Sequence, residues 1–153
     1  MHEKEKMMRI LIDADGCPVV DSAVRIGKAR GIACIILCDT AHFFEKEGAA
    51  TVTVSKGSDS VDFALVNMII AGDIVITQDY GLAAMCLARK AVCLSQNGMI
   101  YDDSNIDSLL LARYTAKKIR QSGGRLKGPS KRTSDQDRNF EKALDRLIEN
   151  NML

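Results

Sequence analysis

Short apolar segments alternate with stretches of helical periodicity along most of this 153-residue chain. The apolar segments have the length and composition of strands that are covered on both faces. They are residues 9–12, 32–38, 50–54, 74–77, 92–94 and 99–101. Because strand, helix and strand in succession form a right-handed crossover, the alternation predicts one three-layer α/β domain with a mostly parallel sheet.

The helical stretches carry start and stop signals. Pro18 suits a first helical turn, and Gly31 and Gly72 suit helix ends. The predicted helices are residues 19–30, 63–71, a segment through Ala83, Leu87 and Arg89, 105–121 and a last one over 134–151. The last helix begins at a capping pattern and carries one apolar stripe, so we expect it to dock on a domain that spans residues 8–153.

The charge is distributed unevenly, although the net charge is only +1. Lys and Arg recur over residues 113–133 without any acidic residue, and the rest of the chain is acidic in balance. A basic segment on an acidic body suits a protein that binds a metal and handles phosphate; the alternative is a solvated basic surface. Within it, the glycine-rich residues 123–133 are expected to form a flexible basic loop.

The cysteines and the apolar segments bear on location. The five cysteines are odd in number, have no paired CxxC spacing and lie mostly in apolar stretches, which is typical of reduced core residues. No stretch has the length of a membrane span or the pattern of a signal peptide. The sequence therefore predicts a cytoplasmic protein that does not insert into a membrane.

Aspartates follow the predicted strands at their carboxyl ends, where ligands bind in open parallel sheets. They are Asp13 and Asp15 after the first strand, Asp59 and Asp62 after the third, and Asp79 after the fourth. Converging carboxylates repel one another unless a cation neutralises them, and an all-oxygen ligand set favours Mg²⁺ or Mn²⁺. The joint placement predicts a site for a hard divalent metal.

Each aspartate also has a local explanation. Asp59, Asp62 and Asp79 are positioned to cap helices, and Asp15 to close a turn before Gly16. A local explanation fits Asp13 less well, because placing a carboxylate at the end of a buried strand costs free energy unless it has a partner. Other candidates are Cys17 as a nucleophile, although no histidine lies near it in sequence, and Asp39, which is better explained by a turn.

Four segments together resemble the YaiI/YqxD family of bacterial proteins, which is itself similar to PIN-like nuclease domains. They are residues 13–19, 57–62, 72–79 with 82–84, and 137–140. The resemblance spans nearly the whole chain after Met8 and implies a PIN-like fold. It implies that Asp13, Asp59 or Asp62, and Asp79, with Asp15 beside them, hold Mg²⁺ or Mn²⁺ and hydrolyse phosphodiesters.

The first functional hypothesis is a metal-dependent nuclease, acting on RNA or DNA, in which Asp13, Asp62 and Asp79 are catalytic. Nucleic acid, with RNA favoured, would be the partner. The basic residues expected to bind it are Lys56, Lys117, Lys118, Arg120, Arg125, Lys127, Lys131, Arg132 and Arg138.

Two alternatives stay open. Residues 13–16 also resemble the first motif of haloacid-dehalogenase-type phosphatases, with Asp13 as nucleophile and Asp15 as general acid/base. The later motifs of that reading would be Thr77, Lys90 and Asp102 or Asp103. The second alternative is a module that binds RNA without catalysis.

Overall fold

A computed structural model describes residues 8–41, 45–57, 60–125 and 131–152 of the chain. One sheet has the strand order β3-β2-β1-β4-β5-β6, parallel except for β6. The strands are β1 (Arg9–Asp13), β2 (Ala33–Asp39), β3 (Ala49–Val54), β4 (Ile74–Ile76), β5 (Val92–Leu94) and β6 (Ile100–Tyr101). The predicted α/β class with a mostly parallel sheet is confirmed.

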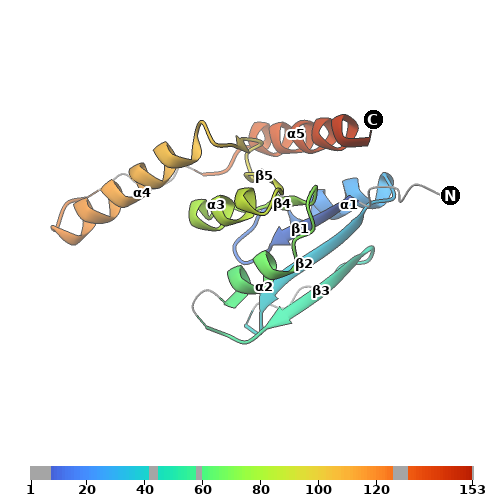
Figure 1. Cartoon of the computed structure of the whole chain (residues 1–153), viewed down its shortest axis with the longest axis horizontal. Coiled ribbons are helices and arrows are strands. Elements are labelled where there is room, and N and C mark those ends of the chain that lie inside the picture. The colour runs from blue at the N-terminus through green and yellow to red at the C-terminus, as the bar shows by residue number, and fades with distance from the viewer. Residues whose placement is uncertain (1–7, 42–44, 58–59, 126–130, 153) are drawn as a thin grey trace.

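The helices of the described residues cover both faces of this sheet (Figure 1). They are α1 (Val20–Ala29), α2 (Ser60–Met68), α3 (Tyr80–Ala88), α4 (Ile106–Gln121) and α5 (Ser134–Met152). The core of one face contains side chains of α1 and α5, and the core of the other contains side chains of α2 and α3. None of the helices in the described part combines the length and apolar character that a membrane span requires.

The central strand β1 contributes to both cores through the alternation of its side chains. Ile10 and Ile12 face the α1 and α5 side, whereas Leu11 faces the α2 and α3 side. All three are fully buried. A strand covered on both faces has no solvent-facing positions, which explains why residues 10–12, after Arg9, are all apolar.

The predicted boundaries of α2 were wrong: the helix runs over Ser60–Met68, not over residues 63–71. A buried ion pair explains where it ends. Arg9 donates to both carboxylate oxygens of Asp73, at 3.1 and 2.6 Å, and to the carbonyl of the last α2 residue at 2.8 Å. Asp73 also accepts the backbone N–H of Ile70 at 2.8 Å. These bonds use the groups that a longer helix would need.

The helix α4 leaves the body of the domain as an arm (Figure 1). Ile106 in its first turn is buried, and Leu109 and Leu110 pack partly against the α3 side of the core. Farther along, Leu111 and Tyr114 are exposed, at 64% and 57% of their surface. The arm is therefore attached to the domain through its first two turns.

The helix α5 docks through its apolar stripe. Phe140, Leu144 and Ile148 are fully buried in the core on the α1 side. The loop between β5 and β6 allows this close approach at Gly98, which has a φ of +90°. A Cβ atom at Gly98 would lie 2.6 Å from the carbonyl oxygen of Asn139 in α5. Glycine is thus required both for the backbone conformation and for the space.

We predict that Gly98→Ala destabilises the protein by at least about 1 kcal/mol more than Gly31→Ala. Gly31 is the matched control, because it also has a positive φ, +68°, but a Cβ there meets nothing within 4 Å. The control should lose about 1–2 kcal/mol from backbone strain alone. Urea unfolding of both variants measures the difference, and equal losses would contradict the close packing of α5.

Candidate functional site

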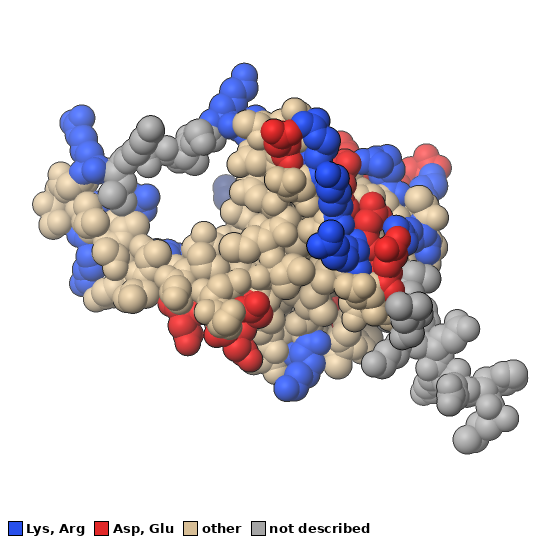
Figure 2. Space-filling model, turned by 90° about the horizontal axis from the view of Figure 1, so that it is seen from above, with Lys and Arg blue, Asp and Glu red and all other residues tan. Residues whose placement is uncertain are grey.

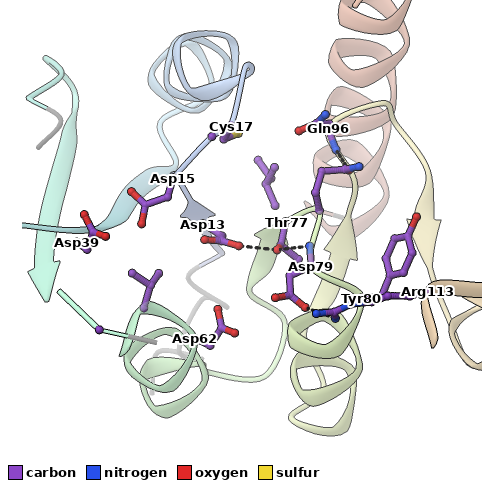
Figure 3. Close-up of a pocket in the computed structure, with 15 residues that line it drawn as sticks. Asp13, Asp15, Cys17, Asp39, Asp62, Thr77, Asp79, Tyr80, Gln96 and Arg113 are labelled. Carbon is purple, nitrogen blue, oxygen red and sulfur yellow. Dashed lines mark hydrogen bonds and ion pairs between the residues drawn. The ribbon is translucent and has the colours of Figure 1, made fainter. Parts of the chain in front are cut away.

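A cavity of about 670 Å³ opens at the carboxyl ends of the parallel strands (Figure 3). It lies where the strand order reverses, since β1 pairs with β2 on one side and with β4 on the other. The helices that follow β1 and β4 pack on opposite faces, which opens a crevice between the strand ends. Its lining residues are Asp13, Asp15, Gly16, Cys17, Asp39, Gly57, Val61, Asp62, Ile76, Thr77, Gln78, Asp79, Tyr80, Gln96 and Arg113.

Thr77 links the ends of the two central strands. Its buried hydroxyl donates to Oδ2 of Asp13 at 2.7 Å and accepts the backbone N–H of Asp79 at 3.0 Å. The hydroxyl of Tyr101 donates to the Thr77 carbonyl at 3.1 Å. One residue therefore holds the Asp13 carboxylate and the loop that carries Asp79 in a defined arrangement.

The environment of Asp13 disfavours its ionised form. Desolvation by burial raises the pKa of this carboxyl above its ordinary value, the Thr77 hydrogen bond opposes that shift, and the negative charges of Asp79 and Asp15 add to it. A carboxylate among like charges is stabilised when a cation enters. Asp13 is thus an acidic group of the cavity that a bound positive charge would stabilise.

The other aspartates reach the cavity from separate elements. Asp62 lies in the first turn of α2, and Figure 3 shows its carboxylate pointing to the same space as those of Asp13 and Asp79. Asp15 and Asp39 lie on the other side of Asp13, beside one another. Asp39 also accepts the N–H of Ala41 at 2.9 Å, the turn role expected for it. The predicted ligand Asp59 lies outside the described residues.

Asp79 has both a local and a long-range role. Its Oδ1 accepts the backbone N–H of Leu82 at 3.1 Å, so the carboxylate caps α3 as its position suggested. The same oxygen lies 3.3 Å from Nη1 of Arg113, which reaches it from α4. Asp79 can therefore cap α3 and line the cavity at the same time.

Within the described ranges, no three Asp, Glu, His or Cys side chains are arranged as a metal-binding group. This excludes a closed cage among those residues of the kind that holds structural Zn²⁺. It still fits Mg²⁺, which keeps several waters and binds through one or two carboxylates together with substrate phosphates. The donor set of the cavity, carboxylates and a hydroxyl, is of the hard-oxygen type that this ion prefers.

The thiol of Cys17 is a poor nucleophile here. Burial raises its pKa, the charge of Asp13 raises it further, and a backbone hydrogen bond from Val19 together with the charge of Arg132 only partly opposes this. A thiol with a raised pKa remains protonated near neutral pH. The structure thus favours a loop-packing role for Cys17.

Most of the later motif residues that the phosphatase alternative requires lie away from the cavity. Thr77 lines the cavity, but Lys90, Asp102 and Asp103 do not. Lys90 precedes β5 and so lies at the opposite edge of the sheet. Asp102 follows the antiparallel strand β6, where its carboxylate accepts from the backbone and hydroxyl of Ser104 at the start of α4. These residues cannot act on a group bound at Asp13.

The basic residues assigned to nucleic-acid binding are dispersed. Figure 2 shows Lys and Arg side chains around the projecting part of the molecule, where α4 lies. The exposed members on and after this arm are Lys117, Lys118, Arg120 and Arg125. Lys56 is exposed next to Gly57 at the cavity, and Lys131 is exposed just before α5. Arg138 pairs with Asp135 on α5. Lys127 lies outside the described residues.

The contacts of Arg132 argue against its predicted role in binding nucleic acid. Its guanidinium donates to the Asp137 carboxylate, to the side-chain oxygen of Asn97 and to the carbonyl of Gln96, each at 2.7 Å. It therefore ties the start of α5 to the loop after β5 and is not a free phosphate ligand. This end of the segment expected to be a flexible loop is anchored.

Four polar side chains of the cavity were not predicted from the sequence. They are Gln78, Tyr80, Gln96 and Arg113. Gln78 and Tyr80 flank Asp79, so their position beside a predicted site residue was the signal that could have identified them. Arg113 belongs to the basic segment, but it pairs with an acid 34 residues away, which no local pattern reveals. Gln96 reaches the cavity only because Arg132 and Gln78 hold its backbone.

The fold and cavity define a class: an α/β protein with an acidic crevice at the switch point of a mostly parallel sheet. The chain belongs to the family described as "Uncharacterized BCR, YaiI/YqxD family", whose profile matches residues 11–150.

Relatives of similar length support this membership. A UPF0178 protein of Exiguobacterium sibiricum is 52% identical over 141 residues, which cover 92% of this chain and 96% of the relative. One from Ruminiclostridium cellulolyticum is 50% identical over 90% of each chain, and one from Clostridium acetobutylicum is 44% identical over 92% and 97%. No solved structure matches the chain significantly.

The raised pKa of Asp13 makes a prediction about stability. The folded state keeps the Asp13 proton to a higher pH than the unfolded state, so this group destabilises the fold increasingly as pH rises through its raised pKa. Asp13→Asn should therefore melt at the same or a higher temperature at neutral pH, with about 2–4 °C for each kcal/mol gained. The gain should vanish as pH falls towards 3.8, the ordinary value.

Asp102→Asn is the control of opposite sign. The Ser104 hydroxyl lowers the pKa of Asp102, so its ionised form stabilises the fold, and this variant should lose stability at neutral pH. That loss should fade as pH falls through the lowered pKa. Thermal melts of the parent and both variants across the acidic range test the pair. A clear loss of stability in Asp13→Asn at neutral pH would contradict the inferred electrostatic strain.

Proposed function

We propose that this protein is a Mg²⁺- or Mn²⁺-dependent phosphodiesterase that cleaves nucleic acid, with RNA the favoured substrate. The observation that carries the proposal is the convergence of the Asp13, Asp62 and Asp79 carboxylates on one cavity at the switch point of the sheet. The resemblance of the sequence to PIN-like nucleases points the same way, because Asp13, Asp15, Asp62 and Asp79, which the resemblance implies as ligands, line this cavity.

Asp13 and Asp62 would hold the ion, and Asp79 and Asp15 would orient the waters bound to it. When bound, the metal would activate a water and stabilise negative charge on the phosphate. The chain itself supplies the orientation: Thr77 holds the Asp13 carboxylate by a 2.7 Å hydrogen bond, and the cap on α3 holds Asp79. Fixed carboxylates need little reorganisation to receive a cation.

A polymer substrate is favoured by the arm that starts at the cavity. Arg113, Lys117 and Arg120 are spaced i, i+4 and i+7, so they lie on one face of α4. The first of them lines the cavity, and the last lies about 10 Å farther along the helix axis at 1.5 Å per residue. Positive charges in such a row suit the phosphates of a nucleic-acid backbone that runs out of the cavity.

The catalytic test compares single Asp→Asn variants on RNA and DNA oligonucleotides. The parent should cleave in Mn²⁺ and lose activity in EDTA, and Asp13→Asn or Asp62→Asn should lower the rate by at least about 100-fold. The matched control is Asp103→Asn, which removes the same charge from an exposed position outside the cavity. It should cleave as the parent does.

Three outcomes would count against this function. Loss of activity in Asp103→Asn would show that the losses in the Asp13 and Asp62 variants are not specific to the cavity. Cleavage that survives both Asp→Asn changes would place the chemistry elsewhere. Metal-independent binding of RNA, with no cleavage over a broad substrate panel, would leave a non-catalytic binding module.

Binding through the arm predicts a salt dependence. Replacing Lys117, Lys118 and Arg120 by Gln should reduce the slope of log affinity against log salt by about 0.7 for each phosphate of single-stranded RNA that these side chains neutralise. A Lys142→Gln, Arg146→Gln double variant is the control, because both side chains are exposed on α5. Fluorescence anisotropy over a range of salt measures the slopes. An unchanged slope in the arm variant would show that the arm is only a solvated surface.

A further inference from the structure

Among the described residues that line the cavity, Arg113 is the one with a basic side chain. It comes from α4, whereas the carboxylates come from β1, β2, α2 and the loops that follow β1 and β4. Its Nη1 lies 3.3 Å from Oδ1 of Asp79, a single contact that is long for an ion pair with a carboxylate. More than half of its side-chain surface, 59%, remains exposed. The guanidinium is thus loosely held at the rim of an acidic cavity.

The rest of the guanidinium fork is available. Within the described part of the chain, its one hydrogen bond is the contact from Nη1 to Asp79. Arg presents five donors in a planar arrangement that matches two phosphate oxygens at once. A side chain that uses one of these donors at 3.3 Å can bind an anion without losing a strong existing bond.

Gly81 makes room for this contact. It lies in the first turn of α3, where its conformation is ordinary and alanine would favour the helix by about 1 kcal/mol. A Cβ there would lie 3.3 Å from Oδ1 of Asp79 and 3.6 Å from Nη1 of Arg113. The added Cβ would thus crowd the Asp79 carboxylate and make an ordinary contact with the Arg113 guanidinium, so Gly81 leaves space on the Asp79 side of the pair.

We propose that Arg113 binds the phosphoryl group of the substrate, and that its contact with Asp79 is the resting position from which it does so. The proposal deepens the proposed function and rests on it for the reaction, although phosphate binding can be measured without turnover. Nothing else among the described lining residues offers a positive charge to a phosphate in this acidic cavity. With Arg113 on the phosphate, the charge of Asp79 is released towards the metal.

The proposal predicts that Arg113→Gln weakens phosphate binding without weakening Mg²⁺ binding. Phosphate should bind at least about tenfold more weakly, because a charge-assisted pair is removed. Mg²⁺ should bind as tightly as in the parent or more tightly, because a positive charge beside Asp79 is gone. Damage to the cavity as a whole would weaken both, so a loss confined to phosphate distinguishes phosphate binding by Arg113 from structural support.

Calorimetric titration measures both affinities in the complete protein. Mg²⁺ is titrated alone, and inorganic phosphate and adenosine 5′-monophosphate are titrated with and without Mg²⁺. Arg113→Lys keeps the charge but not the fork and should recover only part of the phosphate affinity. Arg146→Gln, the same change at an exposed position on α5, should stay within about twofold of the parent for every probe.

The outcomes separate this inference from the proposed function. If the parent binds no Mg²⁺ and cleaves nothing, but phosphate binding still depends on Arg113, the nuclease proposal fails and the assignment of Arg113 stands. If Mg²⁺ binds and cleavage occurs, but Arg113→Gln binds phosphate as the parent does, the assignment of Arg113 is overturned. Weakening of both Mg²⁺ and phosphate in Arg113→Gln, or no phosphate binding by the parent under either condition, overturns it as well.

Discussion

The arrangement of the cavity depends on the parallel pairing of β1 with both β2 and β4. In register, Asp13 pairs with Leu37 on one side, while Ile12 pairs with Ile76 on the other. Asp13 and Thr77, the residues that follow the Ile12 and Ile76 pair, therefore lie at the same level, and the Thr77 hydroxyl is 2.7 Å from the Asp13 carboxylate. Because the backbone ladders set this level, the distance does not depend on the surrounding loops.

The alternation of apolar segments and helices was enough to predict the sheet, its mostly parallel pairing and the edge at which the acids gather. It could not predict the end of α2, because Arg9 and Asp73, which determine it, are 64 residues apart. For the same reason it missed Arg113 in the cavity. Both failures concern ion pairs between distant segments, and local periodicity contains no information about such pairs.

The basic segment shows how one compositional feature can divide into separate roles. In the sequence, its residues form a single run with one expected partner. In the structure, Arg113 reaches an acidic cavity, Lys117 and Arg120 stand on an exposed helix, and Arg132 joins Gln96 and Asn97 to α5. Charge alone did not distinguish these environments, since burial and hydrogen-bonding partners decide what a guanidinium does.

The attachment of α4 through its first two turns makes the helix a lever. If it tilts about Ile106, each residue moves in proportion to its distance from that point, which is about 10 Å for Arg113 and about 21 Å for Arg120. Motion at the outer position is thus halved at the inner one. In such a tilt, a displacement of the outer part of the arm would reach Arg113 at the rim of the cavity at about half its size.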